Sequence, residues 1–204
     1  MLQNVYIFTT MTVIGLIECE LELGATDAKI KQFPHSAFLK ILCTDDITGN
    51  TAPWICGASI LNEKIALTAA HCLESCGTNS VVTVSVGHAH RDRGVMSSMS
   101  SYVIHEHYDS LIIANDIALV SLKTPLKFNE NVKRVAVMKD PPYYEEAQIA
   151  GWGMNNEDAS ITEKILKYID QYVWTSETCR ELLGTVPTGA ICARSSGNLS
   201  YSSR

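Results

Sequence analysis

The stretch "ALTAAHCLES", Ala66 to Ser75, places a histidine directly beside a cysteine at the end of a run of small and apolar residues. Such a run predicts a buried strand, so that His71 would be held where the strand ends. Cys56 flanks the preceding strand-like run, and a disulfide from it to Cys72 would contribute about 3 kcal/mol in the chain-entropy description. That bridge would also fix the backbone beside His71. The stretch therefore predicts an imidazole held in place, as a general base must be.

A second motif supplies a partner for this ring. A general-base histidine needs a carboxylate that fixes its tautomer and stabilises the imidazolium. Asp116, in "NDIALV", stands just ahead of an apolar strand, where a buried carboxylate could face a cleft. Two plainer interpretations stay open, since a histidine beside a cysteine can simply be packed and an Asn-Asp pair before a strand can simply cap a turn.

Composition bounds the class of protein. The chain has 204 residues, 46% of them hydrophobic and 19% charged, which indicates one globular domain or two packed halves. A net charge of -6 and the absence of a basic stripe argue against a nucleic-acid partner. Seven cysteines without a Cys-x-x-Cys pair favour structural disulfides over zinc or redox use. We expect no cofactor and no metal.

The first residues indicate export. Val5 to Ile17, "VYIFTTMTVIGLI", is apolar but short for a membrane span, and it resembles the core of a secretory signal cleaved after Cys19. We therefore expect a signal peptide over residues 1–19 and a secreted, extracellular protein, with no membrane contact after cleavage. Cleavage would leave six cysteines, an even number. "MLQN" lacks a basic side chain, and a buried strand is the alternative interpretation.

Short β-type runs separated by Gly, Pro, Asn and Asp dominate the rest of the chain and predict an antiparallel barrel or sandwich. These runs are "AFLKIL", "WICGASIL", "KIALTAA", "VVTVSVG", "SYVIHE", "DIALVSL", "AQIAGWG" and "ILKYIDQYVW". The more polar Lys123–Val137 is expected to cross between two halves. Thr175–Leu183 begins with a capping residue followed by an acid, which predicts one short helix.

Taken together, "LTAAHC", "NDIALV", "CGASIL", "GWG" (Gly151 to Gly153) and "TDAKIKQFPHSAFLK" resemble the motifs of chymotrypsin-like (peptidase S1, trypsin-like) serine proteases over residues 22 to 204. The resemblance implies an all-β fold of two six-stranded antiparallel barrels. It places a peptidase domain at residues 20–204, with a first barrel over about 26–122 and a partial second barrel over about 135–204. It implies His71 as general base, Asp116 as its orienting partner, and hydrolysis of protein or peptide substrates. It also implies a Cys179–Cys192 disulfide, and a substrate cleft shaped by Tyr108 and Ile113, for which ordinary packing is the alternative.

The chain departs from the family where the nucleophile belongs. The family serine lies in a Gly-Asp-Ser-Gly-Gly segment, whereas this chain reads "ICARSSGNLSYSSR". None of its serines has the glycine neighbours that build an oxyanion hole, so we nominate none of them; they are Ser195, Ser196, Ser200, Ser202 and Ser203. The family's Ile-Val-Gly-Gly start is replaced by "ELGA", Glu22 to Ala25, with no basic cleavage site.

These departures predict a chain that is truncated before its nucleophile and inactive as it stands. A secreted non-catalytic homologue that binds protein partners and a partial gene-model fragment are the alternatives. Because the second barrel would lack strands, its open edges predict marginal stability and aggregation.

Several smaller features complete the expectations. Cys43 and Cys76 remain after the two family-like pairs, and we expect a third bridge between them. His88 with His90, and His105 with His107, could each offer two metal ligands from one strand face. Neither pair shows a third ligand, so solvated loop histidines are the preferred interpretation. "NLS" at Asn198 is a glycosylation sequon if the chain is secreted.

Overall fold

A computed structural model describes residues 25–153, 164–187 and 190–195. The expected signal peptide (1–19), the start of the "ELGA" stretch, the sequon at Asn198 and four of the five serines considered above lie outside these ranges. The elements, in chain order, are β1 (Thr26–Asp27), β2 (Ser36–Thr44), β3 (Thr51–Ile60), β4 (Ile65–Thr68), β5 (Val81–Val86), the 3-10 helix η1 (Arg91–Arg93), β6 (Val95–Ile104), β7 (Ala118–Leu122), β8 (Glu146–Gly151), β9 (Lys167–Trp174), α1 (Ser176–Leu183) and β10 (Cys192–Ser195).

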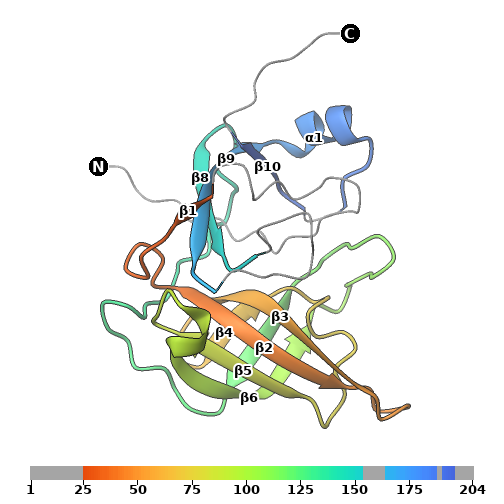
Figure 1. The fold of residues 1–204 in the computed structure, drawn as a ribbon. Helices are drawn as coiled ribbons and strands as arrows, with labels where there is room; N and C mark the ends of the chain where they lie inside the picture. Colours follow the sequence, from red (N-terminus) through yellow and green to blue (C-terminus); the bar gives the residue numbers. More distant parts are fainter. Residues whose placement is uncertain (1–24, 154–163, 188–189, 196–204) are drawn as a thin grey trace.

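Six of the strands close into a barrel in the order β2-β3-β4-β7-β6-β5, and every neighbouring pair is antiparallel. This barrel forms the lower half of Figure 1, and a smaller, open sheet lies above it. The predicted all-β architecture is confirmed, with one complete barrel and a partial second sheet.

Period-two alternation builds the barrel core. On β2, Leu39, Ile41 and Cys43 are buried inside, while Lys40 and Leu42 between them are exposed. β7 shows the same alternation, with Ala118, Val120 and Leu122 buried. This core also takes in both cysteines Cys72 and Cys76 and thereby fixes the segment that carries His71.

β6 is longer than the sequence indicated. The run "SYVIHE" predicts a strand only from Ser101, yet the structure begins the strand at Val95. The first half escapes prediction because its inward position is a serine. Ser97 is buried and its hydroxyl donates to the carbonyl of Thr124 at 3.0 Å, which compensates for the missing apolar side chain.

The second sheet is centred on β9. β8 pairs along one edge of β9, while the other edge is shared by β1 near Tyr168 and by β10 from Gln171 to Trp174. Residues 26–27, which the sequence analysis places in the first barrel, thus pair with the second sheet, and the barrel starts at Ser36. Two residues carry too little pattern to show which sheet they join.

A second apolar cluster joins the two halves. Phe38 points outward from β2 and meets Trp152 of the "GWG" motif edge-on, with ring centroids 5.7 Å apart. The indole N–H of Trp152 donates to the carbonyl of Ala89 at 2.7 Å, and the same carbonyl accepts the N–H of Leu166 at 2.8 Å. Lys123–Val137, expected to cross between the halves, contains no strand and runs from β7 toward β8.

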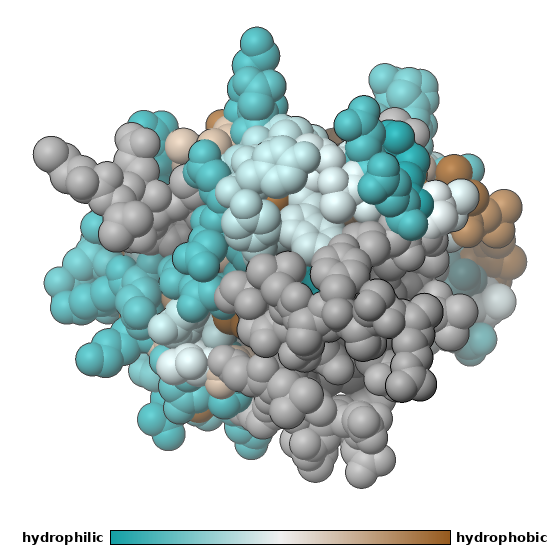
Figure 2. Space-filling view, turned by 90° about the horizontal axis from the view of Figure 1, so that it is seen from above, coloured by the Kyte–Doolittle hydropathy of each residue, from teal (hydrophilic) through white to brown (hydrophobic). Residues whose placement is uncertain are grey.

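The single α-helix of the described residues is the predicted one. Thr175 caps α1 by accepting the backbone N–H of Thr178. Seen from above the second sheet, the coloured surface is mostly hydrophilic to neutral, and hydrophobic residues gather at one rim (Figure 2). Within the described ranges, no helix combines the length and the apolar character that crossing a membrane requires.

Candidate active site

His71 lies in a turn directly after β4, and three contacts hold that turn. The hydroxyl of Thr68 donates to the carbonyl of Gly57 at 2.8 Å, which fixes the end of β4 against β3. The disulfide from Cys72 to Cys56 ties the next residue to the same strand. The indole N–H of Trp54 donates to the carbonyl of Cys72 at 2.9 Å. The backbone beside His71 is therefore anchored to β3 on both sides.

Asp116 lies just before β7, in a segment with unusual backbone geometry. The N–H of Ile117 donates to the carbonyl of Asn115 at 2.8 Å, which closes a three-residue turn around Asp116. Asn115 has a φ of 54°, in the left-handed region that asparagine tolerates better than most residues. Its side-chain amide donates to the carbonyl of His107 at 2.8 Å and fixes this conformation. The turn points the carboxylate of Asp116 inward.

The two side chains meet. Oδ1 of Asp116 accepts the backbone N–H of His71 at 2.8 Å, and Oδ2 lies 2.7 Å from Nδ1 of the ring. The carboxylate is buried, with 2% of its side chain exposed, whereas 42% of the His71 side chain is exposed. Because a carboxylate accepts only, Nδ1 must carry a proton. In the neutral ring Nε2 then keeps a lone pair that faces away from the carboxylate.

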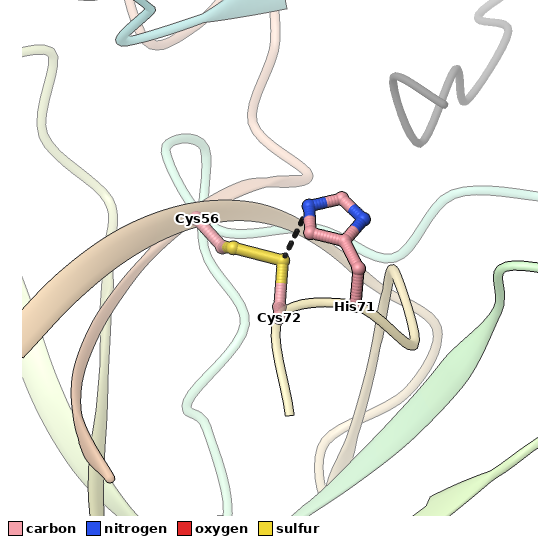
Figure 3. A group of neighbouring side chains, drawn as sticks. All are labelled: Cys56, His71 and Cys72. Atoms are coloured by element: carbon pink, nitrogen blue, oxygen red, sulfur yellow. Dashed lines mark hydrogen bonds between the residues drawn. A yellow bond between two sulfur atoms is a disulfide. The ribbon is translucent and has the colours of Figure 1, made fainter. Parts of the chain in front are cut away.

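Beside this lone pair lies the Cys56–Cys72 disulfide (Figure 3). Nε2 of His71 is 3.5 Å from Sγ of Cys72. The ligand atoms of Cys56, His71 and Cys72 all lie within 4.8 Å of one another, which resembles a metal site by distance alone. The two sulfurs are bonded to each other, however, and zinc binds thiolates. The Cys56–Cys72 disulfide therefore fixes the backbone next to His71, and its sulfurs are not available as thiolate ligands.

The other histidine pairs lie in the segments that follow β5 and β6, which agrees with the preferred interpretation of loop histidines rather than a shared strand face. Nδ1 of His88 accepts the N–H of His90 at 2.8 Å, and Nδ1 of His105 accepts the N–H of His107 at 3.1 Å. Each first histidine thus uses one ring nitrogen to hold its own turn. Across the ranges that the structure describes, neither pair belongs to a group of three metal-binding side chains.

Tyr108 and Ile113 lie in the same loop as Asp116. Tyr108 packs against the barrel core, and burial raises the pKa of its phenol, with the nearby carboxylate of Glu74 adding to the shift. Ile113 has a φ of 53°, which is strained for a β-branched residue. Packing accounts for Tyr108, and whether either residue contacts a substrate stays a prediction.

The candidate serines do not enter this site within the described residues. Ser195 belongs to β10, where its backbone pairs opposite Gln171 of β9. In the part of the chain that the structure describes, the polar contacts of His71 are with Asp116 and Cys72, and no hydroxyl is among them.

All three expected disulfides are present. Cys43–Cys76, Cys56–Cys72 and Cys179–Cys192 have Cα–Cα distances of 4.5, 6.3 and 6.2 Å. The first ties the end of β2 to the turn that follows His71, and the third ties α1 to β10. What sequence reasoning missed were the anchors made by Trp54 and Thr68. No local signal marks them, because each reaches a carbonyl that only the barrel brings near.

Comparisons with known proteins identify the family of this chain. The sequence model of the Trypsin family matches residues 23–202. Hypodermin-B of Hypoderma lineatum is 35% identical over 160 residues, which are 78% of this chain and 59% of that protein. Brachyurin of Leptuca pugilator is 28% identical over 178 residues, 86% of this chain and 74% of that protein. The chain thus spans well under two thirds of the length of hypodermin-B.

Solved structures share the fold. The scabies mite inactivated protease paralogue S-D1 superposes with a TM-score of 0.72 at 20% identity, covering 84% of this chain and 73% of that one. At that identity the likeness concerns the fold alone. The family match spans nearly the whole chain, and the six-stranded barrel is consistent with it. The chain belongs to the trypsin family of chymotrypsin-like serine proteases.

Proposed function

We propose that His71 and Asp116 are the general base and the orienting carboxylate of a serine endopeptidase site. The observation that carries the proposal is the 2.7 Å contact between Nδ1 of His71 and Oδ2 of Asp116. This contact leaves Nε2 with a free lone pair, on a ring that is partly exposed to solvent. The second contact, from the backbone of His71 to the same carboxylate, fixes the distance between the two residues. A base held in this way is ready to accept a proton without first reorganising.

The chemistry follows from those positions. A serine hydroxyl attacks the carbonyl carbon of a peptide bond, and its proton passes to Nε2 of His71. Asp116 stabilises the imidazolium that forms and holds the ring in the correct tautomer. The ring then gives the proton to the leaving amine, so that the C–N bond breaks and an acyl-enzyme remains. Water hydrolyses that ester by the same transfers, which regenerates the serine and the neutral ring.

The 204 residues carry the base and the orienting acid but no Gly-Asp-Ser-Gly-Gly segment. Loss of the serine from such a triad costs about a million-fold in turnover. A polypeptide of these residues is therefore proposed to be inactive toward peptides.

A second candidate function is binding without catalysis. The "ELGA" stretch, Glu22 to Ala25, favours it, because it stands in place of the family's Ile-Val-Gly-Gly start and has no basic cleavage site before it. Such a protein would be secreted and would bind protein partners through the surface of the barrel. Three disulfides support an oxidising, extracellular location.

Labelling with a serine-directed phosphonate tests whether the chain supplies its own nucleophile. The full chain, secreted from a eukaryotic host, should not be labelled and should not hydrolyse peptide substrates. Labelling that the His71→Ala variant abolishes would show that the chain supplies its own serine.

Reading the transcript past the codon for Arg204 tests the endopeptidase proposal. If it encodes the family nucleophile, the extended protein should hydrolyse peptides, and Asp116→Asn should lower kcat by about 10⁴-fold. Hydrolysis that survives His71→Ala would reject the assigned base.

A further inference from the structure

An open hollow of about 510 Å³ lies on the first barrel, away from the His71 site. Its lining residues come from the β3–β4 turn and from the crossing segment; they are Asn62, Glu63, Lys64, Phe128 and Arg134. β4 and β7 are antiparallel, with Ile65 opposite Ser121 and Thr68 opposite Ala118. His71 and Asp116 adjoin the Thr68–Ala118 end of this pair, whereas the hollow adjoins the Ile65–Ser121 end. The two sites are therefore separate.

Backbone hydrogen bonds hold both sides of the hollow together. The carbonyl of Glu63 accepts the N–H of Leu126 at 2.7 Å, and the carbonyl of Ile60 accepts the N–H of Val135 at 2.9 Å. Leu126 and Val132 are buried in the barrel core and anchor the loop between them. The shape of the hollow is therefore formed before a ligand binds, which lowers the entropic cost of binding.

Between these two buried anchors the loop leaves an aromatic ring outside. Phe128 is 39% exposed, although Leu126, two residues earlier, is only 5% exposed. A few large side chains in well-packed pockets carry most of the binding energy at protein interfaces, and Phe128 is the only aromatic ring among the lining residues named above. A partner that covers Phe128 would remove this apolar surface from water.

The charges around the hollow are mainly positive. Within the described residues, no carboxylate forms an ion pair with Lys64 or Arg134. The only acid of the lining is Glu63, and Glu130 on the same segment already pairs with Lys31 at 3.0 Å. The crossing segment carries three more exposed cations, of which two are sequence neighbours of Phe128 and Arg134: Lys123, Lys127 and Lys133. This concentration of cations contrasts with a chain whose net charge is -6.

We propose that this hollow binds an acidic peptide segment that carries an aromatic or large aliphatic side chain. Lys64 and Arg134 pair with the carboxylates, and the apolar side chain of the peptide packs on Phe128. Arginine can hold a carboxylate through two parallel hydrogen bonds, which would orient the segment. A sulfated polysaccharide would satisfy the cations but would leave the ring of Phe128 without an apolar partner. The inference does not depend on catalysis.

A fluorescein-labelled peptide, Asp-Glu-Phe-Glu-Asp, tests the site by fluorescence anisotropy on the full secreted chain. Replacing Lys64 or Arg134 by alanine should weaken binding by up to about fivefold each, the limit for an exposed ion pair. Phe128→Ala should weaken it by about fivefold, the effect of losing roughly 40 Å² of apolar contact. Glu63→Ala should strengthen it, and Lys40→Ala, an exposed lysine on β2, is the matched control with no effect.

Two comparisons complete the test. A peptide with serine in place of phenylalanine should bind the natural chain about fivefold more weakly than the original peptide does. The Phe128→Ala variant should bind the two peptides with equal affinity. Urea unfolding confirms that each variant is folded. The proposal is overturned if Lys40→Ala weakens binding as much as Arg134→Ala does. It is also overturned if Phe128→Ala has no effect, or if only a heparin oligosaccharide binds, since charge alone would then account for the surface.

Discussion

The buried carboxylate of Asp116 should stabilise the fold as well as orient His71. It accepts two hydrogen bonds from His71, at 2.8 and 2.7 Å, and 2% of its side chain is exposed. A hydrogen bond to a charged group contributes about 1.5–3 kcal/mol, so the two contacts would contribute about 3–6 kcal/mol. Removing the carboxylate also removes the cost of burying its charge, which reduces the expected loss for Asp116→Ala to about 3 kcal/mol.

Asp116→Asn provides a milder second variant. The carbonyl oxygen of asparagine can still accept the backbone N–H of His71. The charge-assisted hydrogen bond from Nδ1 is lost, however, so we expect the free energy of unfolding to fall by about 1–2 kcal/mol. For a chain of this size a loss of 1 kcal/mol lowers Tm by about 2–4 °C, which predicts a shift of about 6–12 °C for the alanine variant.

The measurement is urea unfolding followed by tryptophan fluorescence. Trp54 is a suitable reporter because its indole donates to the carbonyl of Cys72, beside the site. Asp170→Ala is the matched control, an exposed carboxylate on β9 that accepts only the side-chain amide of Gln148 at 2.8 Å. It should change the free energy of unfolding by less than about 0.5 kcal/mol. If Asp116→Ala changes it no more than this control, the reasoning about the buried contact is refuted.

Three further predictions concern the rest of the chain. Burial lowers the pKa of His35 from 6.5 to about 4, so the unfolded chain binds the extra proton first as the pH falls. Stability should fall by about 2 kcal/mol between pH 7.5 and pH 5, and a His35→Gln variant should lack this part of the decline in urea unfolding. A Cβ on Gly94 would lie 2.6 Å from the carbonyl of Val86, so Gly94→Ala should cost about 2 kcal/mol or more, whereas Gly57→Ala, with nothing within 4 Å, should cost under about 1 kcal/mol. The outer edges of β8 and β10, unpaired within the described strands, predict association that grows with concentration; light scattering that shows a monodisperse monomer at about 50 μM would contradict it.

Much of the fold follows from local pattern. Local patterns predict three of the elements: the alternation on β2 predicts a strand, the capped start of α1 predicts a helix, and the apolar run before His71 predicts β4. They can do so because residue spacing alone determines which side chains share one face of a strand or helix. The short β1 could not be assigned to its sheet, and the first half of β6 lacks an apolar alternation, because Val95 and Met96 are exposed and Ser97 is buried. Hydrogen bonds to distant carbonyls decide both cases.

The candidate active site, too, was predicted only in part from the sequence. The sequence by itself determined which residue types are available: an imidazole after one strand, a carboxylate before another, and cysteines able to clamp the first. Only the tertiary structure decided that the His71 backbone gives a second hydrogen bond to Asp116 and that Trp54 holds the neighbouring carbonyl. It also decided that Phe128 stays outside while Leu126 enters the core. The physical reason is that spacing along a chain fixes which face a side chain shares with its neighbours. The closure of the barrel fixes which distant groups come within the roughly 3 Å that a hydrogen bond requires.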